Sequence, residues 1–460
     1  MNLSSPIRRS GVGVAAVLAL LAGCASGPAR APADAQPGIP AVLPLGSLPD
    51  SGQPGTLADW HALATDPALQ RLAELALANN RDLRVALLNV ERAQAALAGS
   101  EANKLPAIGV GVGAQRAPNT QGKQVNTFTA GVQLASWELD LFGRLRQLDD
   151  AARASLLATR AGQRAAELAL VSQVLATGLT LRHDDAQLTL ARRTLATRDE
   201  TLRLTVLREK VGAASMLELQ AQQALVAQAR ATLAQWQRQR AQDENALVLL
   251  VGAPVPADLL AAPAGSSPLA EVPVGLPSAV LLQRPDVVQA EQQLLAARAN
   301  LGAARAALWP SITLTGQAGQ ASAQLSGLFE GGHFAYTLAA NAVLSIYDGG
   351  RRQSAIAQAD AAERIALAQY ERAVQSAFRE TADALVALST WREQLAALAQ
   401  QRDAARETAR LTDLKAAQGA ASVLEQLEAQ RSLYAAEQAW LQAGLAEQTS
   451  RVTLYKALGR

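Results

Sequence analysis

Aromatic residues are scarce in this 460-residue chain: they make up 3% of it, although hydrophobic residues make up 49%. The chain is instead rich in Ala, Leu, Gln and Arg, which favours long packed helices over a compact mixed domain. Histidine occurs only three times, at His61, His183 and His333, which are far apart in the sequence. No metal-ligand spacing and no Ser/His/Asp arrangement is present, so we expect no enzyme, no metal and no cofactor.

A large excess of charge of one sign is also missing. Lys and Arg total 42 against 40 Asp and Glu, and Arg8 and Arg9 lie in a segment that we expect to be removed. A nucleic-acid-binding protein would need a clustered basic face, which is not seen. Beyond the N-terminal segment no run of about 20 apolar residues occurs, so no helix is expected to span a membrane.

The N-terminus has the pattern of a lipoprotein signal peptide. Arg8 and Arg9 precede a short apolar run, which ends at Leu21-Ala22-Gly23-Cys24 with the only cysteine of the chain. The run is too short to cross a bilayer as a helix. The order of these parts resembles the bacterial lipobox, whose cysteine carries the lipid, and the alternative is a stray cysteine in an ordinary signal peptide. Residues 1–23 are therefore expected to be removed, and residues 24–56, rich in proline, to form an extended tether.

The remainder reads as two copies of one unit, residues 57–251 and 284–460, joined by a linker at 252–283. Asp82 and Asp286 are 204 residues apart, and Gly212 and Gly419 are 207 apart. A duplication this regular predicts that both halves share one fold.

Each copy predicts the same series of elements. Short helices at about 81–104 and 285–308 lead into β-hairpins at about 105–137 and 309–347, with loops near 118–124 and 321–332. Asp140 and Asp348 stand where a helix N-cap would, and very long helices follow at about 144–210 and 351–417. Return helices, about 215–250 and 422–458, come after turns at 211–215 and 418–422. The chain is thus predicted to be α+β and mainly α.

The few aromatics gather in the hairpins. Half of the sixteen (6 Trp, 5 Tyr and 5 Phe) lie in windows 105–142 and 309–347, about one sixth of the chain. Membrane barrels carry aromatic girdles, although half-buried strands also favour aromatics. Four strands cannot close a barrel and hydrocarbon does not tolerate open edges, so the chain would have to assemble. Eight strands from a dimer or twelve from a trimer would both suffice.

Two apolar rows run along the last helix, as in a coiled coil. Leu427, Tyr434, Leu441 and Tyr455 form the first row, which Gln448 interrupts. Leu433, Trp440 and Leu454 form the second row, which Glu447 interrupts. Two rows on one helix suit a cylinder in which each helix has a neighbour on both sides.

Several motifs together resemble the TolC-type outer-membrane factors, in particular the OprM/NodT-like lipoprotein branch. They are the lipobox at Cys24, Asn79-Asn80-Arg81-Asp82-Leu83, Trp137-Glu138-Leu139-Asp140-Leu141-Phe142-Gly143-Arg144, Arg284-Pro285-Asp286 and Tyr347-Asp348-Gly349-Gly350-Arg351-Arg352. Ala279 departs from the family, which often has an acid there.

The resemblance implies a homotrimer in the cell outer membrane, lipid-anchored through Cys24 and extending into the periplasm. A 12-stranded membrane β-barrel would be continued by a 12-helix α-barrel tunnel. The tunnel would meet a periplasmic adaptor and an inner-membrane pump, often of the RND type. The function would be that of a passive exit duct. A lipid-anchored periplasmic coiled-coil or adaptor protein without a channel is the alternative, which the aromatic-rich hairpins disfavour.

Two sets of residues are candidate sites in such a duct. The first is the pair of helix-reversal turns, Gly212, Ala213, Ala214, Ser215 and Gly419, Ala420, Ala421, Ser422, where glycine ends one helix and serine can cap the next. Their small side chains would leave the backbone open to an adaptor, or they are ordinary tight turns.

The second set is a gate that the resemblance implies near the periplasmic mouth. Glu425, Glu428 and Arg431 are spaced three apart along one side of the helix, and Leu424 would add an apolar constriction. Ala221 and Ala224 replace Glu428 and Arg431 in the first copy. In a trimer the carboxylates would form rings that favour cations. The alternative is a solvated charged helix face.

Overall fold

The computed structural model describes residues 59–260, 268–272, 278–330 and 334–459. Cys24, the expected signal peptide and the expected tether lie outside the described residues, and the linker is described in part. Most of the described chain is helical, and four strands form one sheet. Within the described ranges, no helix is both long and apolar enough to cross a membrane.

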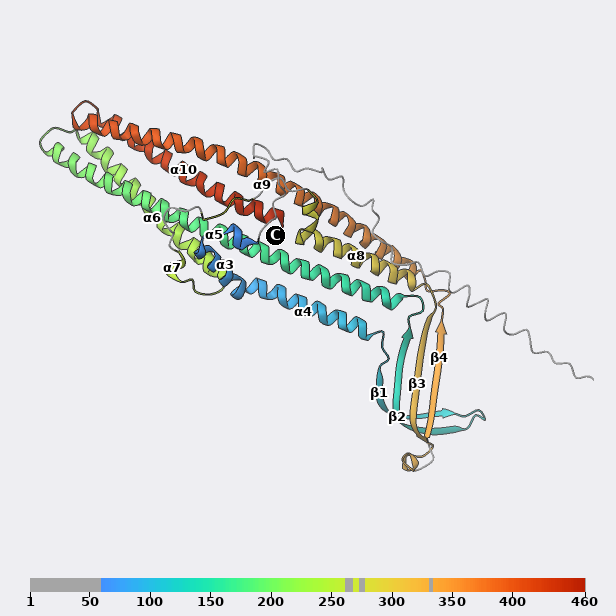
Figure 1. Ribbon diagram of the computed structural model, residues 1–460. Helices are drawn as coiled ribbons and strands as arrows, with labels where there is room; N and C mark the ends of the chain where they lie inside the picture. Colours follow the sequence, from blue (N-terminus) through green and yellow to red (C-terminus); the bar gives the residue numbers. More distant parts are fainter. Residues whose placement is uncertain (1–58, 261–267, 273–277, 331–333, 460) are drawn as a thin grey trace, which may run out of the picture. The chain divides into compact units, whose positions relative to one another are not determined.

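The two halves have the same order of major elements (Figure 1). The first half contains α2 (Trp60–Leu63), α3 (Pro67–Asn79), α4 (Arg81–Ala102), β1 (Ile108–Pro118), β2 (Gln124–Leu139), α5 (Arg144–Lys210) and α6 (Met216–Val251). The second contains α7 (Ala257–Leu260), η2 (Ser278–Gln283), α8 (Pro285–Ala306), β3 (Ser311–Ser322), η3 (Leu325–Gly327), β4 (Phe334–Val343), α9 (Arg351–Ala417) and α10 (Val423–Leu458).

The strand ends differ most from the sequence expectation. β3 continues to Ser322, into the segment expected to be a loop, and β4 stops at Val343 rather than at 347. The pairing explains the second difference. Ser311, the first residue of β3, already pairs with Val343. Pro310 precedes it and has no N–H to extend the ladder, so residues beyond Val343 find no partner on β3.

Helix α3 was not anticipated from the sequence. Asp66 caps it through a hydrogen bond from the Ala68 N–H, and Pro67 occupies its first position. Leu69 and Leu72 of this helix are 1% exposed. Leu69 lies against Gly178 of α5, where a Cβ would come within 2.7 Å of its methyl group. The local signal for this helix was Asp66-Pro67, a common way for a helix to begin.

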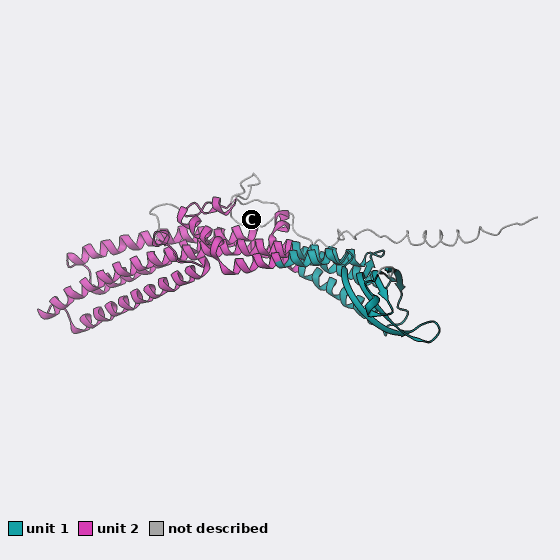
Figure 2. Cartoon of the chain, turned by 90° about the horizontal axis from the view of Figure 1, so that it is seen from below, with its two compact units in different colours: residues 1–37, 92–157, 291–371 teal, residues 38–91, 158–290, 372–460 magenta. Residues whose placement is uncertain are grey.

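The chain divides into two compact units, which Figure 2 colours separately. Unit 1 contains Arg92–Leu157 and Glu291–Glu371, and therefore the whole sheet. Unit 2 is built mainly from Ala158–Ala290 and Arg372–Arg460, together with the described chain from residue 59 to Glu91. Its hydrophobic core includes Leu72, Leu175, Leu247, Leu388 and Leu454, which come from five different helices.

The sheet of unit 1 is antiparallel, in the order β1-β2-β3-β4. Two hairpins, β1–β2 and β3–β4, are joined by pairing between β2 and β3 (Figure 1). A β-bulge lies between Leu134 and Trp137 of β2. Within the described part of the chain, β1 and β4 are the edges of the sheet, and each has one side without a partner strand.

Candidate functional site

The two helix-reversal turns have the same backbone design. Gly212 and Gly419 adopt φ values of 72° and 75°, in the left-handed region where glycine is favoured. The residues after them, Ala213 and Ala420, each donate their N–H to a carbonyl of the preceding helix at 2.8 Å, on Arg208 and Lys415 respectively. Both turns lie at an exposed surface. Their sequence therefore ends each long helix sharply.

A capping box starts each return helix. The Ser215 hydroxyl accepts from the Glu218 N–H at 3.2 Å, and the Glu218 carboxylate accepts from the Ser215 N–H at 2.8 Å. Ser422 and Glu425 repeat this arrangement, with distances of 3.2 and 2.7 Å. The Ser422 N–H and, at 2.9 Å, the Ser422 hydroxyl both donate to the Glu425 carboxylate, and these two hydrogen bonds lower the pKa of Glu425. Glu425, a candidate gate residue, thus has a local structural task that Glu218 shares.

The other candidate gate residues point into solvent. Leu424 is 72% exposed, and Glu428 and Arg431 are also exposed. Neither Glu428 nor Arg431 forms an ion pair with any residue in the described ranges. Within one chain these side chains form no constriction, and they are free to contact a second chain or a passing ion.

Farther along α10 lies a buried carboxylate that was not predicted from the sequence. Glu437 is 6% exposed and forms ion pairs with Arg193 of α5 and with Arg406 of α9, the latter at 3.3 Å. It therefore ties three helices of unit 2 together. No local pattern marks it, because its partners lie 244 and 31 residues away.

Two further arginines join the same helices. Arg198 of α5 is 5% exposed and donates to the Gln430 side chain at 2.9 Å. Its burial, and then the nearby positive charge of Arg431, lower the pKa of Arg198. The Arg402 guanidinium lies 4.1 Å from the ring centroid of Trp440. This cation–π contact is a packing interaction rather than a binding site for an external ligand.

The apparent break at Glu447 in the second apolar row is a buried ion pair. Glu447 is 2% exposed, and its carboxylate accepts from Arg451 at 2.7 Å and lies 3.6 Å from Arg392 of α9. A carboxylate is tolerated in the row because two arginines compensate it.

The sheet of unit 1 has two chemically different faces. Strand register places on one face, here called the apolar face, the side chains of Ile108, Val110, Val112, Ala114, Phe128, Ala130, Val132, Leu134, Trp137, Leu139, Ile312, Leu314, Gly316, Ala318, Phe334, Tyr336, Leu338, Ala340 and Ala342. Its polar members, Arg116, Gln124, Asn126, Gln320 and Ser322, lie at the loop ends of the hairpins. Many of the large apolar side chains are strongly exposed, as Val110 is at 83%.

The opposite face, here called the polar face, carries mainly glycine, hydroxyl and carboxamide groups. It consists of Gly109, Gly111, Gly113, Gln115, Ala117, Val125, Thr127, Thr129, Gly131, Gln133, Glu138, Ser311, Thr313, Thr315, Gln317, Gly319, Ala321, Ala335, Thr337, Ala339, Asn341 and Val343. An apolar and a polar face on one sheet is the pattern of a barrel wall between lipid and water.

The sheet bends sharply toward the polar face. Gly131 and Gly319 are direct partners on β2 and β3. A Cβ on Gly131 would lie 2.6 Å from the Gly319 Cα, and one on Gly319 would lie 2.5 Å from the Gly131 Cα. In a flat sheet the corresponding Cβ atoms are about 5 Å apart. Each backbone thus lies where the other's side chain would be, which makes the polar face the concave one.

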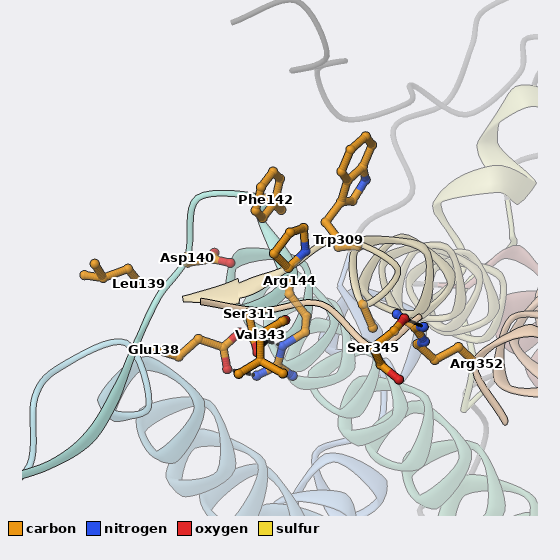
Figure 3. Close-up of a pocket in the computed structure, with 13 residues that line it drawn as sticks. Glu138, Leu139, Asp140, Phe142, Arg144, Trp309, Ser311, Val343, Ser345 and Arg352 are labelled. Atoms are coloured by element: carbon orange, nitrogen blue, oxygen red, sulfur yellow. Dashed lines mark hydrogen bonds and ion pairs between the residues drawn. The ribbon is translucent and has the colours of Figure 1, made fainter. Parts of the chain in front are cut away.

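A pocket of about 370 Å³ lies where the strands of unit 1 meet the helices (Figure 3). Phe142 and Trp309 stack beside it, with ring centroids 5.5 Å apart and planes 10° apart. Arg144 forms two hydrogen bonds to Glu138, at 2.9 and 2.6 Å. The Asp140 carboxylate accepts from the N–H groups of Leu145 and Arg146, which caps α5.

The second strand–helix junction is built alike. Asp348 accepts from the N–H groups of Gly350 and Arg352 and from the Arg352 side chain, at 3.0, 3.2 and 2.8 Å. The Arg352 guanidinium also donates to the Ser345 carbonyl. In both junctions the charged groups are used to anchor the helix start. No group of three potential metal ligands occurs among the residues that the structure describes.

This chain is similar to known outer membrane proteins, among them outer membrane proteins of efflux pumps. A model of the outer membrane efflux protein family matches residues 72–253 and 276–460. The chain is 41% identical to the toluene efflux pump outer membrane protein TtgF of Pseudomonas putida, over 95% of this chain and 94% of that protein. It is 37% identical to the outer membrane protein OprJ of Pseudomonas aeruginosa, over 87% of this chain and 86% of that protein.

A solved structure agrees with these sequences. The open state of the MtrE outer membrane channel of Neisseria gonorrhoeae has a TM-score of 0.83 and 34% identity, covering 92% of this chain and 95% of that chain. The long helices, the sheet with one apolar and one polar face, and the similarity to a solved channel together indicate an outer-membrane channel protein. The chain belongs to the outer membrane efflux protein family. This family consists of transport ducts, which confirms the channel interpretation over a channel-free coiled-coil protein.

Proposed function

We propose that three copies of the chain assemble into one duct. Their twelve strands would close a membrane β-barrel, and their long and return helices would form a twelve-helix tunnel in the periplasm. The observation that carries this proposal is the sheet, which has an apolar convex face, a polar concave face and two edges without partners among the described residues. Hydrocarbon requires all such edges to be paired, so more than one chain must contribute.

The duct would act passively. We infer that an inner-membrane pump of the RND type delivers compounds through a periplasmic adaptor, and that the duct releases them outside. A lipid on Cys24 would hold the mature N-terminus at the outer membrane. No cofactor other than this lipid is needed, because the pump supplies the energy.

Ion conductance of the purified protein in a planar bilayer tests the duct directly. We expect stable channels together with a heat-modifiable, trimer-sized band from outer-membrane fractions. Dimer-sized bands with normal conductance would replace the trimer by an eight-stranded assembly. Protein that reaches the outer membrane but never conducts would return the channel-free alternative.

The adaptor is proposed to dock on the two helix-reversal turns, Gly212–Ser215 and Gly419–Ser422. Their exposure and small side chains leave room for a partner backbone. Ala213→Trp and Ala420→Trp should abolish export and leave the assembled channel and its conductance intact. Normal export in both variants would show that these are ordinary turns.

The gate is proposed to involve Leu424, Glu425, Glu428 and Arg431. In a trimer Glu428 would recur in a ring that favours cations, and Arg431 would tie neighbouring chains. Single-channel recording should show a higher resting conductance for Arg431→Ala and weaker cation selectivity for Glu428→Ala. Parental behaviour of both variants in the same salt would leave these charges as a solvated helix face.

A further inference from the structure

Net charge is absent from the polar face of the sheet. Among the side chains that the register places there, the one ionisable group is Glu138, at the helix end of β2. Arg144 binds both of its carboxylate oxygens, at 2.9 and 2.6 Å, and so cancels its charge locally. The remaining polar groups are hydroxyls and carboxamides, which both donate and accept hydrogen bonds without a charge.

The polar side chains of this face also lie close to the backbone of the sheet. Gln133 of β2 pairs with Gly109 of β1. Its side chain lies over Gly111, where an added Cβ would meet the Gln133 Nε2 at 2.6 Å. An added Cβ on Gly113 would meet the Thr129 hydroxyl at 3.0 Å. The polar side chains of β2 thus lie along the sheet, in room that the glycines of β1 leave free, rather than standing up from it.

We propose that this concave polar face is an uncharged section of the passage, which admits neutral amphiphilic molecules and ions of either sign alike. The inference rests on the proposed duct. Rings of charged side chains give a pore its ion preference, and this section has none. Hydroxyl and amide groups replace part of a solute's hydration without binding one sign of charge. Glycine keeps the surface low enough for bulky apolar groups to pass.

A matched cysteine pair first tests which face lines the passage. Gln133→Cys and Val132→Cys are adjacent on β2 and lie on opposite faces. A charged, membrane-impermeant thiol reagent should change the conductance of Gln133→Cys channels and leave Val132→Cys channels unchanged. The parent is the control for its single native cysteine, Cys24. The reverse pattern would overturn the inference while the protein remains a channel.

Opposite charges at one position then test the electrostatics. Gln133→Glu and Gln133→Lys each place a net charge on the polar face. We expect the cation-to-anion permeability ratio, measured from reversal potentials in a salt gradient, to move in opposite directions by about twofold or more. If neither variant changes the ratio, passing ions do not sense this face and the inference is wrong.

The Glu138–Arg144 pair gives an independent test. Glu138→Gln should shift the permeability ratio toward anions, because it leaves Arg144 uncompensated. The double variant with Arg144→Gln should return to the parental ratio. A double variant that stays anion-preferring would show that Glu138 acts as a net charge in the parent, which contradicts an uncharged section. A parent that does not conduct at all would instead reject the proposed function.

Discussion

Asp184 of α5 has a carboxyl with a strongly raised pKa. Its side chain is 1% exposed and its carboxyl is hydrogen-bonded to that of Asp243 on α6. Burial, the bond to Asp243 and the charges of Asp243 and Asp185 raise the pKa of Asp184 to about 7, against a partly opposing charge on Arg240. Below about pH 7 we therefore expect the folded chain to hold a proton on Asp184, shared with Asp243.

The sign of the pH effect follows from proton linkage. The folded chain holds a proton on Asp184 that the unfolded chain releases near its ordinary pKa of 3.8. Stability should therefore fall as pH rises from about 4 to about 7, and the loss should be complete above that. Asp184→Asn cannot ionise, so its melting temperature relative to the parent should be higher at pH 8 than at pH 5. Asp258→Asn, at an exposed position of α7, serves as control. An unchanged difference between the two pH values would contradict the shared proton.

The buried Glu437 side chain allows a second prediction. Glu437→Gln removes a buried carboxylate from two arginines whose own side chains are 61% and 56% exposed. Water can partly compensate these arginines, so we expect a loss of stability on the order of 2 kcal/mol in denaturant unfolding. Glu428→Gln makes the same change at an exposed position of the same helix and should cost less than about 0.5 kcal/mol. Equal effects would mean that the Glu437 contacts add no stability.

The sequence predicts the role of a residue when its partners are neighbours along the chain, and not when they come from distant helices. Gly212 and Ser215 could be assigned their roles because a turn and a helix cap depend on neighbours within a few positions. Asp184, Glu437 and Glu447 could not be assigned partners. A carboxylate among polar helix residues looks the same whether it meets solvent or an arginine from a distant helix.

The return helices depend on their first turns. Ser215→Ala and Ser422→Ala each remove one capping box, and each should cost about 1 kcal/mol, because an N–H at the helix start loses its acceptor. Ser432→Ala lies at an exposed position inside α10 and should not destabilise, since alanine favours helix interiors. Chemical denaturation of the three variants checks the order. If Ser422→Ala matches Ser432→Ala, the box is not formed in solution.

Glycine, aspartate and proline explain why the element ends were predictable to different degrees. The long helices begin just after Asp140 and Asp348 and end at Gly212 and Gly419, residues with clear local signals. The end of β4 had no such signal, because it depends on where β3 begins across the hairpin. The bend at Gly131 and Gly319 was equally hidden, since two separate glycines gain their meaning only when they become partners.

The whole molecule is expected to be held at the membrane by its N-terminus as well as by its strands. Cys24 lies outside the described residues, and its lipidation remains a prediction from the sequence. Two or more acyl chains give stable anchoring. Mass spectrometry of the mature N-terminal peptide should find Cys24 as its first residue, carrying lipid. Cys24→Ala should weaken targeting more than it weakens assembled channels, and an unmodified Cys24 in the parent would rule out the anchor.

The two open edges of the four-stranded sheet also have a consequence for genetics. In the proposed ring each edge strand pairs with another copy, so one copy with a damaged β1 would disrupt every ring that it enters. If rings of three form at random from equal amounts of intact and damaged chains, only about one ring in eight would be wholly intact. Such an allele would be dominant over the normal one, whereas an allele that prevents synthesis of the chain would be recessive.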